Sequence, residues 1–286
     1  MIKTSYNYRK TIFYSLSRHH TTLNSYDNNL LSSRSTREGR KVIMKNFSWQ
    51  YDEMRQTGVD YTDLSEVEAY DERMGKLRDV KQEAGDIVKL LDIGSEDTVI
   101  EFGTGTGWLA CTAAQHCKRV IAVDISANML KYAKKRSEEQ GIHNIDFFHG
   151  GFLTYQHSGE TVDIVITQLA LHHLPDFWKQ IALKRISNML KEGGILYIKD
   201  TVYSFDMNNY WQFFNQWISG TLTSAGEELA HEIEVAVREE FSTCDWIMEG
   251  LLKHAGFKIH KAEYDQGFLA QYICIKAQGD IQNLTL

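Results

Sequence analysis

The chain of 286 residues contains one proline, four cysteines and no long run of apolar residues. A membrane-spanning helix needs about 18 to 20 apolar residues in succession, so the sequence predicts no membrane span. The cysteines lack the paired spacing of a metal site, and Cys111 and Cys274 lie within apolar segments. Together with the lack of a secretory hydrophobic region, this pattern favours reduced, buried thiols and predicts a cytoplasmic protein.

Acidic and basic residues are present in ordinary numbers but are unevenly distributed. The apolar share of 43% and the charged share of 24% are typical of a globular protein. Residues 1–41 hold eight Lys and Arg against two acids, a net charge of +6, which leaves −13 for the remainder of a chain whose total is −7. This acidic body argues against nucleic acid as the principal partner.

The first 92 residues divide into two parts. Residues 1–45 are polar and basic, with no sustained apolar periodicity, and predict a disordered tail. The scarcity of acids in residues 1–40 leaves an organelle transit peptide as the alternative. Residues 46–92 carry apolar side chains at three- and four-residue steps and predict a helical cap, in which Tyr61 or Tyr70 could pack in the core or close over a ligand.

A glycine-rich loop is the most informative stretch of the chain. The short apolar run Val99–Phe102 is followed by Gly103, Gly105 and Gly107, and then by the small and apolar residues 109–114. This order predicts a strand, a tight loop and a buried helix. Glycines let the backbone approach a ligand closely, and the start of the next helix presents free N–H groups to it.

A second predicted strand, residues 119–124, ends on Asp124, twenty-one positions after Gly103. A nucleotide-binding βαβ unit places a carboxylate about 20 residues after its glycine loop, where it accepts hydrogen bonds from ribose hydroxyls. Ser126 is a suitable N-cap for a helix that runs to Gly141. The loop and the acid together predict a site for a ligand that carries a ribose.

Strands and helices alternate in the following residues. The sequence predicts strands at 145–149, 162–167 and 195–199, and a helix from 176 to 191 that stops at Gly193-Gly194. Apolar strands of this kind are typical of a parallel sheet that is covered by helices on both faces. Residues 203–240 interrupt the alternation with a helical insertion that is rich in aromatic side chains.

The C-terminal part closes the sheet. Residues 242–245, Ser-Thr-Cys-Asp, resemble a capping box before a helix from Trp246 to His254. The last two predicted strands, 257–262 and 270–277, are joined by a connection too short for a helical crossover, so they should pair as an antiparallel hairpin.

The ordered set of motifs resembles the class I S-adenosylmethionine-dependent methyltransferases between Thr98 and Ala277. The third glycine comes one residue earlier than in a dinucleotide-binding fingerprint, which speaks against a nicotinamide dehydrogenase. The segment from Gln168 to Pro175 looks like the small-molecule branch, including quinone-biosynthesis enzymes. The motifs that carry the resemblance are Glu101–Gly107, Val123-Asp124, Asp163–Leu174 and Leu190–Gly194.

This resemblance implies an α/β fold with a doubly wound, Rossmann-like sheet of seven strands in the order 3-2-1-4-5-7-6, strand 7 antiparallel. The cofactor-binding methyltransferase domain would span residues 93–280. The helical N-terminal extension would precede it, and the insertion at 203–240 after strand five would form a lid over the substrate. The alternatives for the insertion are a dimer contact and ordinary core.

The resemblance also implies S-adenosyl-L-methionine as cofactor. Glu101 would hold its amino-acid end, and Asp124 would bind the ribose. The family commonly has an acid after strand three that accepts from the adenine amino group, whereas this chain has Gly151-Phe152, so the adenine contacts stay open. The cofactor-binding residues would be Glu101, Gly103, Thr104, Gly105, Gly107, Asp124, Ile125, Gly151, Phe152 and Gln168.

Candidates for catalysis lie just beyond strands four and five. His172 and His173 follow strand four and could act as a base or simply pack, and Asp200 ends strand five and could contact the substrate. No metal site is expected, because the histidine pair has no third ligand that the sequence identifies. In the predicted lid the substrate-binding candidates are Tyr203, Tyr210, Trp211 and Phe214.

The favoured function is methyl transfer from S-adenosylmethionine to a small-molecule acceptor by direct in-line displacement. One alternative is an inactive cofactor-binding or partner protein of the same fold, because fold alone does not establish activity. Another is methylation of RNA or protein. The identity of the acceptor and the oligomeric state stay open.

Overall fold

The structure is a computed structural model that describes residues 49–277 apart from 56, 59–60 and 62. The predicted basic tail, residues 1–45, lies outside the described residues. A compact unit begins at Gln50 and contains all the elements described below. Within the described residues, the helices are too short or too polar to cross a bilayer.

The N-terminal cap contains α1, Leu64–Gly75, and α2, Val80–Leu90. The helical part starts later than the predicted residue 46, because the Asp63 carboxylate caps α1 by accepting from the backbone N–H of Ser65. The described residues before Asp63 form turns and bends, without regular helix or strand.

Asp71 ties α1 to the glycine loop. Its carboxylate accepts from the Thr106 hydroxyl at 2.6 Å and pairs with Arg136. The Arg136 guanidinium also lies 4.0 Å from the ring centre of Trp108, the first residue of helix α3, Trp108–Ala114. Trp108 therefore serves to dock the cap on the loop.

The sheet has the strand order β3-β2-β1-β4-β5-β8-β7, with a short β6, Thr243–Cys244, beside β5. The sequence predicted the order 3-2-1-4-5-7-6. The two orders agree, because the short β6 takes a number and the predicted strands 6 and 7 therefore become β7 and β8. Strand β8 pairs antiparallel with both β5 and β7, so the predicted terminal hairpin is confirmed. The main strands are β1 Thr98–Phe102, β2 Arg119–Asp124, β3 Ile145–His149, β4 Val162–Gln168, β5 Leu190–Tyr203, β7 Phe257–Asp265 and β8 Leu269–Lys276.

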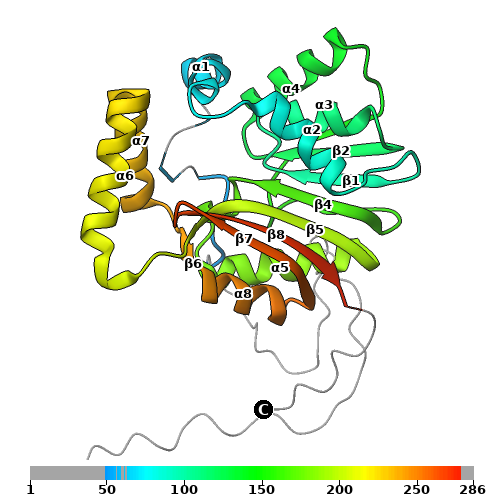
Figure 1. Cartoon of the computed structure of the whole chain (residues 1–286). Coiled ribbons are helices and arrows are strands. Elements are labelled where there is room, and N and C mark those ends of the chain that lie inside the picture. Colours follow the sequence, from blue (N-terminus) through cyan, green and yellow to red (C-terminus); the bar gives the residue numbers. More distant parts are fainter. Residues whose placement is uncertain (1–48, 56, 59–60, 62, 278–286) are drawn as a thin grey trace, which may run out of the picture. The chain divides into compact units, whose positions relative to one another are not determined.

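Helices cover both faces of the sheet (Figure 1). On one face α2 and α3, Trp108–Ala114, bury Ile87 and Leu109 against strand residues such as Ile166. On the other face α5, Asp176–Met189, and α8, Asp245–His254, bury Leu183 and Leu252. Helix α4, Ala127–Glu139, contacts β2 and β3 and is capped by the Ser126 hydroxyl, as predicted.

Two predicted boundaries at β5 are wrong. Helix α5 ends at Met189, and β5 already begins at Leu190, because Leu190 pairs with Val162 of β4 before an irregularity in the register. Strand β5 also continues to Tyr203, so Asp200 lies inside the strand and not at its end. Long apolar pairing with β4 and β8 outweighs the helix-stopping signal of the two glycines.

The predicted capping box before α8 is also not formed. The N-cap is Cys244, which makes no side-chain capping bond. Thr243 and Cys244 instead form β6 and pair parallel with Val202 and Tyr203. The Thr243 hydroxyl lies 3.2 Å from a carboxylate oxygen of Asp176, so a tertiary contact replaces the local one.

The insertion after β5 contains α6, Tyr210–Ala225, and α7, Glu227–Glu239, preceded by a 3-10 turn at Met207–Asn209. Figure 1 shows the two helices side by side, and they turn at Gly226. Arg73 of α1 is buried and pairs with Glu232 of α7 at 2.8 Å. This ion pair links the N-terminal cap to the insertion.

Leu183 and Ile181 on α5 test the packing on the sheet face that α5 and α8 cover. Leu183 is fully buried, whereas Ile181 is 36% exposed. Leu183→Ala should lower the free energy of unfolding by about 2 to 5 kcal/mol, because it leaves a cavity in the core. The matched variant Ile181→Ala should lower it by less than about 1 kcal/mol in the same denaturant titration. Equal losses would contradict the described packing.

Candidate active site

A cavity of about 850 Å³ opens beyond the carboxyl ends of β1, β4 and β5. Its size is within the range of small-molecule sites. One end is bounded by the glycine loop, and the other by α6, α7 and the β7–β8 turn. Apolar residues at this second end are Trp217, Ile233, Val237, Phe268 and Leu269.

The glycine loop is shaped by close packing on one side and open space on the other. The φ angles of Gly103, Gly105 and Gly107 are 73°, 53° and 82°, a region that side chains disfavour. A Cβ on Gly103 would lie 2.5 Å from the Cβ of Ala170, and one on Gly107 would lie 2.7 Å from that of Ala133. A Cβ added to Gly105 would have no contact within 4 Å among the described residues, apart from its chain neighbours, so the loop leaves room for a ligand.

Two carboxyl groups are buried behind and beside this loop. Burial raises the pKa of Glu101 to about 8, although its carboxylate accepts a 2.7 Å hydrogen bond from the Thr104 hydroxyl. Burial also raises the pKa of Asp124, while the backbone N–H groups of Gly105 and Ser126 each donate to it at 2.8 Å. A cationic ligand with hydroxyl donors would compensate the cost of burying the negative charge of both groups.

The predicted cofactor residues separate into two groups. Gly103, Gly105, Asp124, Ile125, Gly151, Phe152 and Gln168 line the cavity. Glu101, Thr104 and Gly107 are buried and lie outside its wall. Gln168 adds a donor: its Nε2 is buried without a hydrogen-bond partner in the described part of the chain.

Glu53 is a cavity residue that the sequence did not predict. It is buried and accepts at Oε1 from the backbone N–H groups of Leu153 (2.8 Å) and Thr154 (2.6 Å). A Cβ on Gly151 would lie 2.7 Å from its carboxylate, so Gly151 provides the space for it. The chain thus places an acid from the N-terminal segment beside the loop after β3. The family that the sequence resembles commonly has its acid within that loop.

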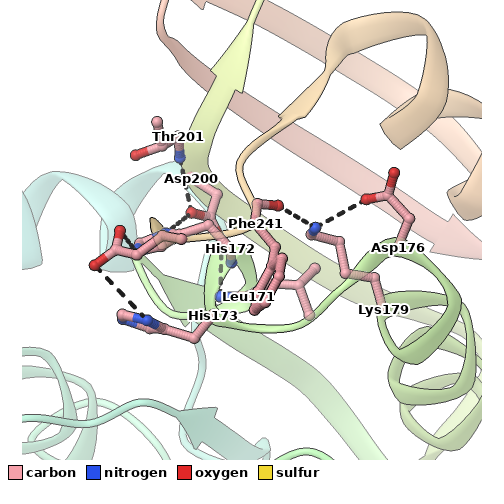
Figure 2. Close-up of polar contacts among 9 residues, drawn as sticks. Leu171, His172, His173, Asp176, Lys179, Asp200, Thr201 and Phe241 are labelled. Atoms are coloured by element: carbon pink, nitrogen blue, oxygen red, sulfur yellow. Dashed lines mark hydrogen bonds and ion pairs between the residues drawn. The ribbon is translucent and has the colours of Figure 1, made fainter. Parts of the chain in front are cut away.

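The histidine pair lies in a 3-10 turn, Leu171–His173, between the two ends of the cavity. Figure 2 shows the His172 ring beside Asp200, whose Oδ1 binds Nδ1 of that ring. Nε2 of His172 lies 3.3 Å from Oε2 of Glu240, and Nδ1 of His173 lies 3.9 Å from Oε1 of the same carboxylate. Glu240 is the second cavity residue that the sequence did not predict.

The electrostatics of this cluster distinguish the two histidines. Burial alone would lower the pKa of His172, but the carboxylates of Asp200 and Glu240 raise it to about 10. Burial and the neighbouring charge of His172 lower the pKa of His173 to about 4. The His172 imidazole also lowers the pKa of both carboxyl groups against the effect of burial. Asp200 itself is fully buried and lies outside the cavity wall.

The predicted substrate residues are mostly outside the cavity wall. Tyr203 lines the cavity, and Phe214 packs on it with ring centres 5.3 Å apart. Tyr210 and Trp211 are 56% and 73% exposed. The aromatic content of α6 did not reveal which face points inward, and the structure places Trp217 on that face, stacked on Phe268 at 3.9 Å.

Residues 99–194 match the family described as a methyltransferase domain. An uncharacterized methyltransferase of Geobacillus thermodenitrificans is 28% identical over 197 residues, which cover 69% of this chain and 84% of the relative. These matches support the assignment of the chain to the class I S-adenosylmethionine-dependent methyltransferases.

Solved structures agree with the fold of this methyltransferase. A S-adenosylmethionine-dependent methyltransferase from Clostridium acetobutylicum has a TM-score of 0.56 at 15% identity, covering 75% of this chain and 98% of the other. A SAM-dependent methyltransferase from Aquifex aeolicus has a TM-score of 0.52 at 16% identity, covering 75% and 99%. At such low identity these structures show the fold alone.

The cavity of the methyltransferase fits its cofactor. S-adenosylmethionine carries ribose hydroxyl donors, which suit the buried Asp124 carboxylate in the cavity wall, whereas Glu101 lies buried behind that wall. The unpartnered Nε2 of Gln168 and the open space at Gly105 offer a donor and room for the ligand. The predicted likeness to the quinone-biosynthesis branch stays a prediction.

Gly105 provides a test of the loop, with Gly193 as the control. Both have positive φ (53° and 76°), and the described residues leave open space around each, but only Gly105 lines the cavity. Each Gly→Ala variant should cost about 1 to 2 kcal/mol of stability from backbone strain. Gly105→Ala should also weaken S-adenosylhomocysteine binding in calorimetry at least tenfold, because the methyl group enters the ligand space. Gly193→Ala should bind normally, and equal affinities would contradict this placement.

Proposed function

We propose that the methyltransferase transfers a methyl group to a small molecule bound between the histidine turn and the apolar end of the cavity. The observation that carries this proposal is the continuity of one cavity from Gly105 and Asp124 to Trp217 and Phe268. The polar groups of His172, His173 and Glu240 lie along the same cavity. An acceptor with an apolar body and one polar reacting group would match both kinds of surface.

Five residues would contact the cofactor in the proposed cofactor half. Asp124 would accept from the ribose hydroxyls, and Gly103 and Gly105 would approach the cofactor with their backbones. Gln168 would donate to the methionine carboxylate. Glu53 would accept from the adenine amino group in place of the acid that is missing after β3. Each of these residues lines the cavity, which supports the assignment.

The cofactor supplies an electrophilic methyl group on a sulfonium. In the proposed in-line transfer the acceptor atom forms a bond to this methyl carbon, and the S–CH3 electron pair stays on sulfur, giving S-adenosylhomocysteine. A proton of the acceptor leaves to solvent. The chain contributes by holding the acceptor at attack distance in the cavity. The entropy cost of bringing the two reactants together is then met on binding and no longer adds to the barrier of the transfer step.

The residues of the histidine turn take separate roles in this proposal. His173 and Glu240 face the acceptor, whereas Asp200 acts as a positioning residue, because it lies behind His172 and outside the cavity wall. Residues 203–240 enclose the acceptor half, with Trp217, Thr221, Ile233 and Val237 replacing Tyr210, Trp211 and Phe214 as acceptor contacts.

Incubation with radiolabelled S-adenosylmethionine and fractions of a metabolite extract tests methyl transfer. We expect label in a low-molecular-weight product, and we expect Asp124→Ala to abolish it while weakening S-adenosylhomocysteine binding by tenfold or more. Asp146→Ala, which removes a half-exposed carboxylate that pairs with Arg119 at 2.5 Å, should retain both properties. Binding without any labelled product would favour an inactive cofactor-binding protein, and label in RNA or protein would favour a macromolecular acceptor.

The adenine role of Glu53 has its own test. Glu53→Gln keeps an oxygen for the N–H groups of Leu153 and Thr154 but can replace the acceptor for adenine with an amide donor. It should weaken S-adenosylhomocysteine binding about tenfold, the equivalent of one charged hydrogen bond. Binding of S-inosylhomocysteine, which lacks the adenine amino group, should fall much less. An equal loss for both ligands would refute adenine recognition by Glu53.

A further inference from the structure

Three potential metal ligands converge at the centre of the cavity. His172, His173 and Glu240 each offer one ligand atom, a ring nitrogen or a carboxylate oxygen, and these three atoms lie within 4.8 Å of one another. Nε2 of His172 lies 3.3 Å from Oε2 of Glu240, a separation that two ligands of one ion can have. The third ligand that the sequence did not identify beside the histidine pair is therefore present in the fold.

Asp200 holds His172 as a metal-binding histidine is usually held. Its Oδ1 binds Nδ1 of the ring, and its Oδ2 accepts from the backbone N–H groups of Leu171 (2.8 Å) and His172 (3.2 Å). The ring orientation is thus fixed with Nε2 toward Glu240. Histidines that bind a metal commonly donate their other ring N–H to a carboxylate in this way.

The backbone of the other two ligands is fixed by contacts from separate elements. The Phe241 N–H, next to Glu240, donates to the His172 carbonyl at 2.9 Å, and the buried Lys179 ammonium donates to the Phe241 carbonyl. The Tyr51 hydroxyl donates to the His173 carbonyl at 3.2 Å. Figure 2 shows Lys179 reaching from α5 to Phe241. Such rigid support is what a preorganised site requires.

We infer that His172, His173 and Glu240 bind one transition-metal dication of the zinc class, with Asp200 as the positioning residue behind His172. Two imidazoles and one carboxylate suit Zn²⁺ and its first-row neighbours better than Mg²⁺ or Ca²⁺, which prefer oxygen ligands. The carboxylates of Asp200 and Glu240 lie in a largely buried place on either side of the His172 ring, and a dication bound to Nε2 in place of a proton would balance their two negative charges.

Three protein ligands leave a coordination position open, and all three residues line the cavity. That position would hold the hydroxyl or thiol of the acceptor and favour loss of its proton, as zinc does for bound water. This role in transfer rests on the proposed function. The binding of the ion does not.

The test is titration of the full-length, chelator-treated protein with Co²⁺, followed by competition with Zn²⁺. We expect one ion per chain, with visible absorption bands of a low-coordinate site that Zn²⁺ removes. His173→Gln and Glu240→Gln should each lower the affinity at least tenfold, and Asp200→Asn about 10- to 100-fold. The control His231→Gln changes an exposed histidine of α7, 3.6 Å from Glu234, and should bind normally.

Two further measurements distinguish loss of the metal site from loss of folding. Circular dichroism and S-adenosylhomocysteine affinity report whether each variant is folded, and His173→Gln replaces the most exposed of the three ligands. Folded variants that bind Co²⁺ as tightly as the unchanged protein, or an unchanged protein that binds no stoichiometric ion, would overturn the metal site. Stoichiometric Co²⁺ binding without methyl transfer to any acceptor would support the site and refute the proposed function.

Discussion

The buried carboxylate of Asp200 is the interaction on which the centre of the site depends. It binds the His172 ring and accepts three backbone N–H groups, from Leu171, His172 and Thr201. A buried carboxylate is tolerated only when its charge is compensated, so β5 and the turn after β4 must keep their relative positions. Because that turn lies between the two ends of the cavity, the geometry of both ends depends on this one side chain.

The insertion is connected to this centre at its C-terminal end. Glu240 follows α7 directly, and Phe241 is held by the His172 carbonyl and by Lys179 of α5. Arg73 of α1 pairs with Glu232 in α7. The apolar wall formed by α6 and α7 is therefore attached to the sheet and to the cap, and the acceptor half has a defined shape around the polar cluster.

Much of the sheet could be predicted because its determinants are local. Apolar strands, the glycines with positive φ and the short connection at residues 266–268 depend on neighbours in the sequence. Predictions were wrong where distant partners decided the outcome. Pairing of Leu190 with Val162 ended α5 early, and the Thr243 contact with Asp176 replaced a local cap.

The sequence by itself determined the class of cofactor site, because a glycine loop and an acid at a set spacing serve one nucleotide-binding unit. Tertiary structure alone decided which other residues face the ligands. Glu53 reaches the loop after β3 across about 100 positions of chain, and Glu240 reaches the histidine turn from the end of an insertion. The inward face of α6 was likewise decided by packing, which turns Trp217 into the cavity and leaves Tyr210 and Trp211 exposed. Long-range contacts of this kind leave no periodic signal in the sequence, since they depend on how whole elements pack.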